Sequence, residues 1–562
     1  MKCFFAICKS DKACALAEKN RHGVGSMEVP EAAETGTQMQ QNIELGTRTA
    51  KVASSVLLGK LIIFILVGLS FIVVARVLGP GTYGIYTLAM AIIGIFGSVG
   101  DLGIGISFNK FLPEYMQNGE KGKARELLKN GFAMLLVFGS VMTAAMFLLS
   151  TPLAAHIYHN SSYSGIIEVA SFLILLSILY GDAYSALIGL RASKSIAITA
   201  GIESAVQASA SVSLALLGYG ALAPILGLIM GYIAGLAVAL AFVGKTVRGA
   251  QGGSISLSRI KELMGFSLPL GVSNLMGTLM SNISLVILGL FAASVVIGNF
   301  GVASKVGSLI DLITGSISVS LITMFSAALA SNKGKEEIAK FYNYSLYLAF
   351  LLVTPLLFYI AVLAKPFSYV AFSGVYKLSP LYIAIMAIGI FLGLLGTYSY
   401  NLMVSANRVR KVLLYTAITS AIELALLPVL IPYFKGVGLT VLLFIIAPLV
   451  GDFLYVFGLH SVFRIGIKPG KISRVIFANA ISFVPVWIIG FLIGNTMMIP
   501  TLIISALAVV VIYPPALVLV KGMKESDIEI VKRTTKEVPI IGTAVGYILE
   551  YSKLFSKHMA HS

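Results

Sequence analysis

Charge is scarce in this sequence. Only 12% of its 562 residues are Asp, Glu, Lys or Arg, which is about half the ~25% of an average soluble domain. Hydrophobic residues make up 57% of the chain, and the mean hydropathy is +0.93. A soluble chain of this length would form roughly four domains, and so few charges could not cover their surfaces. The composition excludes a soluble protein and indicates a polytopic membrane protein.

Several functional signatures are missing as well. Cysteine occurs only at Cys3, Cys8 and Cys14, a spacing that fits neither a disulfide framework nor a zinc site. No Gly-x-x-x-x-Gly-Lys-[Ser/Thr] motif is present, so direct use of ATP is not indicated. His156 and His159 have no carboxylate beside them in the sequence. We therefore expect no metal and no cofactor.

Long apolar stretches separated by short polar loops fill the chain after residue 53. A helix needs about 20 mostly apolar residues to cross the hydrocarbon core of a bilayer. By this measure we expect an all-α protein with about fourteen spans, near residues 54–77, 84–108, 130–150, 165–189, 196–217, 221–243, 265–290, 297–328, 344–364, 380–404, 412–432, 437–460, 474–494 and 499–520.

The loops between these spans separate by charge. Loops after even-numbered spans hold 21 Lys and Arg, and loops after odd-numbered spans hold three. Basic short loops stay in the cytoplasm, so both termini are predicted to be cytoplasmic, in a cytoplasmic membrane. The net charge of +17 is therefore an orientation signal, not the sign of a nucleic-acid partner that it could be in a soluble protein.

Two stretches of the chain pair without a gap. Residues 57–92 align with residues 271–306, and the alignment places Gly84 on Gly298 and Ser70 on Ser284. Transporters are often built from such repeats, with the substrate site between them. We expect a cytoplasmic tail (1–52), two six-helix lobes (53–245 and 246–462), two appended spans (463–520) and a cytoplasmic amphipathic tail (521–562).

The run ARVLGPGTYGIY at Ala75–Tyr86 and the run GDLGIG at Gly100–Gly105 resemble the opening of the polysaccharide-biosynthesis (Wzx-type) flippases. These belong to the multidrug/oligosaccharidyl-lipid/polysaccharide (MOP) exporter superfamily. The resemblance implies a two-lobed, MATE-like transporter, not an enzyme. It would move a polyprenyl- or dolichyl-(di)phosphate-linked oligosaccharide or polysaccharide precursor across the membrane by alternating access. Fourteen spans resemble this branch and the lipid II flippases more than the twelve-span MATE exporters.

Charged side chains inside the spans are candidates for function, because a charge at the bilayer centre costs about 2.5–3.5 kcal/mol on insertion scales. Lys305 lies roughly eight residues, or about 12 Å, into its span, and Lys60 enters the first span from the cytoplasmic side. We expect both to line a central cavity and to bind an anionic head group. The alternatives are a structural ion pair for Lys305 and a snorkelling side chain for Lys60. Asn274 and Asn282 offer hydrogen bonds to sugar hydroxyls or to neighbouring helices.

The acids within the spans are candidates for ion coupling. Asp311, Glu423 and Asp101 are the residues we expect to couple transport to H⁺ or Na⁺, with structural hydrogen bonding as the alternative. For the other acids, helix caps and bonds between helices are the expected roles. At the external end of the first span, Arg76 is expected to be an interfacial anchor.

Two other functions are compatible with such a chain. An ion-coupled MATE-like exporter of organic cations would have only acids in its cavity. A membrane polysaccharide polymerase or ligase would need a large external loop, whereas the external loops here are short. The expected partners are a lipid-linked sugar, membrane lipids and H⁺ or Na⁺. No feature fixes the oligomeric state, and a monomer is expected.

Overall fold

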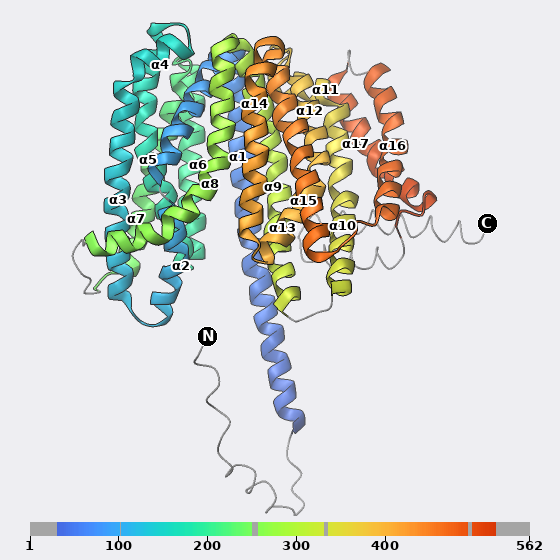
Figure 1. The fold of residues 1–562 in the computed structure, drawn as a ribbon, viewed down its shortest axis with the longest axis horizontal. Helices are drawn as coiled ribbons and strands as arrows, with labels where there is room; N and C mark the ends of the chain where they lie inside the picture. The colour runs from blue at the N-terminus through green and yellow to red at the C-terminus, as the bar shows by residue number, and fades with distance from the viewer. Residues whose placement is uncertain (1–30, 102, 250–256, 331–334, 493–496, 524–562) are drawn as a thin grey trace, which may run out of the picture. The chain divides into compact units, whose positions relative to one another are not determined.

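The structure is a computed structural model that describes residues 31–101, 103–249, 257–330, 335–492 and 497–523. Within these ranges every regular element is helical, with seventeen α-helices, one 3₁₀-helix and one π-helix (Figure 1). The chain forms two compact units, Met1–Leu57 and Leu58–Ser562, and the larger unit carries the predicted spans. The predicted amphipathic tail lies, from residue 524 on, outside the described residues.

Among the described residues, each predicted span is largely helical, because only a helix satisfies every backbone N–H and C=O within a single segment in lipid. Their bounds are α1 (Glu31–Asp101), α2 (Ile104–Gln117), α3 (Lys121–Leu148), α4 (Ser150–Ile157), η1 (Ser161–Tyr163), α5 (Ser164–Gly189), α6 (Ser193–Leu216), α7 (Leu222–Thr246), α8 (Leu257–Phe291), α9 (Ser294–Ala330), α10 (Lys335–Val362), α11 (Ala364–Phe372), α12 (Ser379–Leu392), α13 (Leu394–Ser405), α14 (Val409–Val441), η2 (Leu442–Ile446), α15 (Ala447–Phe463), α16 (Pro469–Leu492) and α17 (Met498–Leu519).

Length and hydropathy identify eight of the described helical stretches as long and apolar enough to cross a membrane, or nine if the bent pair α12–α13 counts as one span. The protein is therefore an integral membrane protein. The number fourteen stays a prediction. One reason for the difference is that two predicted spans are merged into one continuous helical stretch at α1 and again at residues 410–463.

Sharp backbone turns occur inside these merged stretches. Gly79 (φ 67°, ψ 172°) breaks α1 directly before Pro80, and Lys435 (φ 48°, ψ −128°) breaks α14. Glycine tolerates the positive φ, and proline is compatible only with the start of the next helical segment. The prediction that the second span reaches residue 108 is wrong, because Gly103 takes a left-handed conformation (φ 71°) between α1 and α2.

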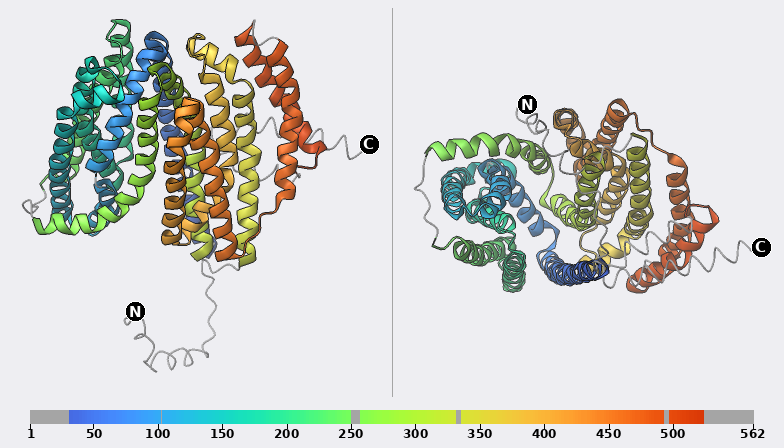
Figure 2. Two further views of the ribbon diagram at one scale, coloured as in Figure 1. Left: turned by 45° about the horizontal axis from the view of Figure 1, so that its top comes forward. Right: turned by 90° about the horizontal axis from the view of Figure 1, so that it is seen from below.

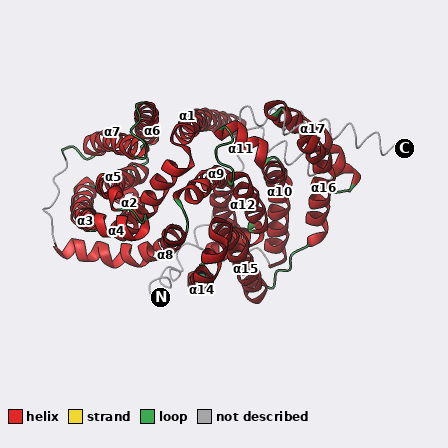
Figure 3. Cartoon of the chain, turned by 90° about the horizontal axis from the view of Figure 1, so that it is seen from above, coloured by secondary structure: helices red, strands yellow, loops and turns green. Residues whose placement is uncertain are grey.

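Two bundles make up most of the larger unit. Helices α2–α7 pack on one another, and α9–α15 pack on one another, with α16 and α17 attached to α10 and α11 (Figure 2). Between the bundles, α8 contacts α2, α3 and α4 on one side and α14 on the other. On the other side, α1 lies between the bundles (Figure 3), where Val74 belongs to a buried cluster with Ala215 of α6 and Ala223 of α7 and Arg76 donates to the Ala371 carbonyl of α11.

The largest cluster of buried apolar side chains runs through both bundles. It includes Ala89 and Ala303, which the sequence alignment pairs and which are both fully buried. A second cluster joins α9, α10, α13 and α15 to α16 and α17. Because burying apolar side chains gives no net gain over lipid, tight packing and buried polar bonds must hold such helices together. One such bond joins Asn479 Nδ2 to Thr354 Oγ1 at 2.7 Å.

Candidate functional site

Each bundle contains a cavity of about 480 Å³. The first cavity lies between α1, α2, α5 and α8. The second lies between α10, α12, α13, η2 and α15. The side chains that line the two cavities differ in their chemistry.

A pair of carboxyl groups dominates the first cavity. Asp101, at the end of α1, and Asp182, on α5, hydrogen-bond each other through their side chains. Two carboxyl groups can share a hydrogen bond only when one of them is protonated, so such a pair can hold and release a proton. Backbone N–H groups of Gly103 and Gly105 donate to Asp101 and Asp182, respectively. A Cβ on Gly105 would lie 2.6 Å from Asp182 Oδ1, so a glycine is needed for this approach.

Hydroxyl and amide groups surround this acid pair. They are Ser98, Asn109, Ser177, Ser185 and Thr278. No lysine or arginine lines either of the two cavities in the described part of the chain. The first cavity is therefore suited to a proton, to a metal or organic cation, or to neutral groups rich in hydroxyls.

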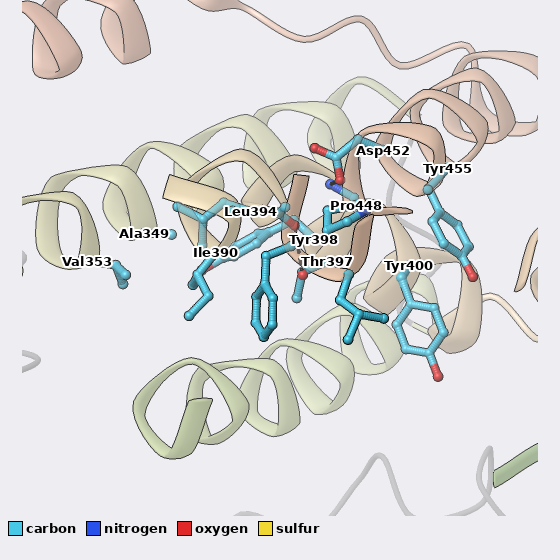
Figure 4. A pocket seen from close by; sticks show the side chains of 16 residues that line it. Ala349, Val353, Ile390, Leu394, Thr397, Tyr398, Tyr400, Pro448, Asp452 and Tyr455 are labelled. Atoms are coloured by element: carbon cyan, nitrogen blue, oxygen red, sulfur yellow. Dashed lines mark hydrogen bonds between the residues drawn. The ribbon is translucent and has the colours of Figure 1, made fainter. Parts of the chain in front are cut away.

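The second cavity is built on a broken helix. Helices α12 and α13 meet at Gly393 with a bend of 46°, and the break leaves backbone N–H groups at the start of α13 without helical partners. Asp452 on α15 accepts a hydrogen bond of 2.8 Å from the N–H of Gly396. This agrees with its expected role as a cap. Figure 4 shows Asp452 at the edge of the cavity.

Aromatic rings form another wall of the second cavity. Tyr400 and Tyr455 meet edge to face, with ring centroids 5.6 Å apart (Figure 4). The Tyr455 hydroxyl also hydrogen-bonds Thr416 Oγ1 at 3.0 Å. One carboxylate, several hydroxyls and aromatic faces give this cavity both polar and apolar surfaces.

Another buried acid, Glu423, joins α8 to α14. Ser284 Oγ donates to Glu423 Oε1 at 3.0 Å, and both residues are buried. Two residues earlier on α8, the Asn282 amide packs against Gly94 of α1, where a Cβ would lie 2.6 Å from its nitrogen. Asn282 Nδ2 donates to the Thr278 carbonyl within its own helix. Helix α8 therefore contacts both α1 and α14.

The predicted cationic site is only partly described. Lys305 on α9 is exposed, and it lines neither cavity. Among the described residues no ion pair with an acid is found for it. The side chains of Lys60, Asn274 and Asp311 lie outside the described part of the structure. Of the sequence candidates, Asp101 is thus the one that lines a cavity, together with Asp182, for which only a structural role is expected from the sequence.

At the end of the bundles that carries Gly79, the two halves meet directly. A Cβ on Gly84 of α1 would overlap the carbonyl group of Ser294 on α9, and a Cβ on Gly298 would overlap the carbonyl group of Pro80. Such backbone contact is possible only between glycines. We call this end of the molecule the closed end.

Hydrogen bonds of Arg76 and Tyr376 also join the two halves at the closed end. Arg76 donates through Nε to the Ala371 carbonyl at 2.7 Å and through Nη2 to the Val370 carbonyl. These carbonyls lie in the last turn of α11, where a cation is favourable. The Tyr376 hydroxyl donates to the Ala75 carbonyl at 2.7 Å, and burial raises the pKa of Tyr376 well above its usual range, so it remains a donor. Arg76 thus has partners within the protein, which the sequence expectation of an interfacial anchor does not include.

Four aromatic side chains form a closed cycle of contacts around these hydrogen bonds. Phe71 and Tyr83 belong to α1, whereas Phe372 and Tyr376 belong to the segment from α11 to α12. Each ring meets two others edge to face, with centroids 5.5–6.3 Å apart. Asn299 of α9 holds the same segment by accepting from the N–H groups of Leu378 and Ser379. No local sequence pattern indicates this cluster, because its members lie about 300 residues apart.

Residues 49–329 match the family of proteins described as polysaccharide biosynthesis protein, which is half of the chain. The chain belongs to this family. No curated protein matches the sequence. The resemblance to the polysaccharide-biosynthesis family seen in Ala75–Tyr86 is thereby confirmed.

Solved structures agree on the fold of this polysaccharide biosynthesis protein. The lipid II flippase MurJ in an inward closed conformation is similar with a TM-score of 0.63 and 13% identity, over 81% of this chain and 97% of MurJ. An inward-facing multidrug resistance MATE family transporter of the MOP superfamily has a TM-score of 0.59 and 14% identity, over 73% and 94% of the two chains. A MOP superfamily transporter from Pyrococcus furiosus has a TM-score of 0.51 and 16% identity, over 74% and 96%. The chain thus shares the fold of these MOP superfamily structures.

Proposed function

We propose that the protein is a flippase. It moves a polyprenyl- or dolichyl-(di)phosphate-linked oligosaccharide, or another polysaccharide precursor, across the cytoplasmic membrane by alternating access. Both termini are cytoplasmic in this proposal, and the closed end faces outward. The protein acts as a monomer and requires no cofactor.

The closed end is the observation that carries this proposal. The crossing of Gly84 and Gly298 joins the two halves at the closed end, and the bonds of Arg76 and Tyr376 reinforce it. A transporter that alternates access needs a barrier on one side that can be broken without unfolding either bundle. Hydrogen bonds and aromatic edges between the halves form such a barrier. Membership of a polysaccharide biosynthesis family supports the sugar-bearing substrate.

The proposed roles of individual residues follow their chemistry. Lys305 is exposed and contacts the substrate phosphate, with Lys60 receiving the head group from the inner leaflet. Asn274 and Asn282 bond sugar hydroxyls. Asp101 couples the cycle to protons through the pair that it forms with Asp182. Glu423 and Asp311 are the further ion-coupling residues.

A second candidate function is favoured by one observation. Both cavities contain carboxyl groups and, among the described residues, no cation. An ion-coupled exporter of organic cations would bind its substrate in such surroundings. The MATE transporters that share the fold make this the alternative to test against the flippase.

Reconstitution separates these two functions. The purified protein is placed in liposomes with a fluorescent polyprenyl-diphosphate-linked oligosaccharide, and the transfer of the label between leaflets is measured. A flippase speeds this transfer and leaves ethidium uptake unchanged. Replacing Lys305 with Gln removes a charged contact to phosphate, so we expect a loss of about tenfold or more in the transfer rate.

Two matched variants complete the experiment. Lys305→Arg keeps the charge and should retain most of the activity. Lys377→Gln removes a lysine from an exposed position at the closed end and should behave as the unmodified protein. Full activity of Lys305→Gln would refute the role of Lys305. Ethidium transport without lipid transfer would refute the flippase and support the exporter.

A further inference from the structure

A third cavity, of about 390 Å³, lies on the first bundle, away from both cavities described above. Helices α3 and α7 each pack on α5 and form the walls of a groove over it. Leu179 of α5 lies between these walls. The groove is lined by two matching rows of side chains, Arg125, Leu128, Lys129, Phe132 and Leu136 on α3 and Leu236, Leu240, Val243, Gly244 and Val247 on α7.

The groove has the length of one lipid leaflet. On α3 its lining runs from Arg125 to Leu136, and on α7 it runs from Leu236 to Val247. At 1.5 Å per residue each row is about 16 Å long. Half of a hydrocarbon core of roughly 30 Å is about 15 Å. An acyl chain of one leaflet therefore matches the groove from end to end.

The polarity of the groove is confined to one end. Arg125 and Lys129 lie in the first turns of α3, and the last turn of α7 at the same end carries Lys245, followed by Arg248. Lys129, Lys245 and Arg248 are exposed. No acid is among the residues that line the groove. The remaining lining residues are apolar.

Apolar side chains continue away from the cationic end. Leu136 is 54% exposed and Leu240 is 43% exposed, whereas Leu128 and Val243 are buried. The floor of the groove is thus closed, and its rim is open to the surroundings of the bundle. An amphiphile with an apolar chain and a negatively charged head complements this surface along its whole length.

We propose that this groove binds a phospholipid with an anionic head group. Its acyl chain lies between α3 and α7, and its phosphate contacts Arg125 and Lys129. A lipid of neutral net charge would fill the apolar part equally well but would gain less from the two cations. The loop preceding α3 is predicted to be cytoplasmic, so the lipid belongs to the cytoplasmic leaflet. This site is independent of the transported substrate and of the two acidic cavities.

Native mass spectrometry tests the proposal on the full-length protein in detergent. Palmitoyl-oleoyl phosphatidylglycerol and palmitoyl-oleoyl phosphatidylcholine are added at equal concentration, because they share their acyl chains and differ in net charge. We expect phosphatidylglycerol to be retained preferentially. Each Lys or Arg side chain near an anionic lipid surface contributes to the binding free energy. The loss of both cations should therefore reduce phosphatidylglycerol retention by about 30-fold. The variant Arg125→Gln/Lys129→Gln is the direct test.

The control removes the same charges elsewhere at this end of the bundle. Arg191→Gln/Lys194→Gln also eliminates one exposed arginine and one exposed lysine, but neither residue lines the groove. This control should retain phosphatidylglycerol as the unmodified protein does. A third variant, Leu240→Trp, fills the apolar part and should reduce the retention of both lipids without altering charge.

Folding is checked separately, by comparing the melting temperatures of all variants in lipid-free detergent. Equal losses in the groove variant and in the Arg191/Lys194 control would overturn the proposal, because retention would then follow total charge. Equal retention of the two lipids by the unmodified protein would overturn it as well.

Discussion

Gly84 and Gly298 lie against each other at the crossing of α1 and α9, and each would clash with the other helix if it carried a Cβ. The Gly84 position faces the Ser294 carbonyl, and the Gly298 position faces the Pro80 carbonyl. The sequence alignment of residues 57–92 with 271–306 pairs Gly84 with Gly298 and also pairs Pro80 with Ser294. Each contact is therefore the counterpart of the other, and the two halves of the chain meet at equivalent points of their repeat.

The crossing gives a first prediction about stability. Gly84→Ala and Gly298→Ala should each destabilise the protein by about 1–3 kcal/mol, because the added methyl group meets backbone that cannot move aside like a flexible side chain. Thermal unfolding in detergent measures the effect. Gly201→Ala is the control, since nothing lies within 4 Å of the added Cβ, and it should be neutral or slightly stabilising. Unchanged stability of both crossing variants would contradict this contact.

A second prediction concerns the opening of the closed end. The double variant Arg76→Gln/Tyr376→Phe removes the three bonds to the Ala371, Val370 and Ala75 carbonyls. At about 1 kcal/mol for each bond, the open fraction should rise by roughly 150-fold. The measurement is the rate at which an impermeant maleimide labels Thr87→Cys from outside, in a protein whose three native cysteines are replaced by serine.

Tyr369→Phe is the matched control for that experiment, because its ring is 51% exposed at the same end of the molecule. It should leave the labelling rate unchanged. If the double variant were labelled no faster than this control, these bonds would not hold the end closed.

Proton coupling is the subject of a third prediction. The side chains of Asp101 and Asp182 hydrogen-bond each other, and an amide in place of either acid removes a carboxyl proton that such a pair can exchange. Asp182→Asn and Asp101→Asn should each abolish the acceleration of transport by a pH gradient, whereas downhill exchange of substrate continues. Glu168→Gln alters an acid that bonds Ser150 outside the cavity, and it should keep the response to the gradient. A gradient response in both Asn variants would remove the pair from the coupling mechanism.

The broken helix of the second cavity gives a fourth prediction. Asp452→Ala leaves the Gly396 N–H without its acceptor, at a cost of about 1–3 kcal/mol. Asp452→Asn keeps an oxygen acceptor at the same place and should retain most of the stability. Comparing the melting temperatures of the two variants checks this. Equal losses would mean that the negative charge of Asp452, rather than the hydrogen bond, stabilises the start of α13.

A fifth prediction concerns the contact between α8 and α14. Glu423→Gln can still accept a bond from Ser284 and should fold normally, whereas Glu423→Ala leaves a buried hydroxyl without a partner and should destabilise the protein by about 1–3 kcal/mol. If Glu423 also couples an ion, Glu423→Gln should lose the dependence of transport on a Na⁺ or H⁺ gradient. Full coupling in Glu423→Gln would limit this residue to a structural role.

Hydropathy predicts where the helices lie, because every segment that spans lipid must be apolar and must satisfy its backbone hydrogen bonds within a helix. The same pattern predicts the break at Lys435, which lies between the expected spans 412–432 and 437–460. It does not predict the break at Gly393, which lies inside the apolar stretch of the expected span 380–404. The glycine that ends the second predicted span, Gly103, is visible in the sequence, but only the structure shows that it takes a left-handed conformation.

The sequence predicts the residue types of the candidate site, but it does not predict which of these residues contact one another. Asp101 and Glu423 stand out because acids are costly within a span. Their partners, Asp182 and Ser284, lie on other helices, and hydropathy contains no information about which helices meet. Arg76 shows the same limit, since its position indicates a membrane interface and only the fold brings the end of α11 within reach.

The sequence by itself determined an integral membrane protein, the approximate course of its helices, the pairing of its two halves and the family to which it belongs. These properties follow from composition, from periodicity and from residues adjacent in the chain. Only the tertiary structure decided that Gly84 meets Gly298, that Asp101 hydrogen-bonds Asp182 and that Arg125 and Lys129 lie at one end of an apolar groove. Each of these depends on helices far apart in the chain coming within a few ångströms, and packing between side chains, not the hydropathy of any one segment, sets that geometry.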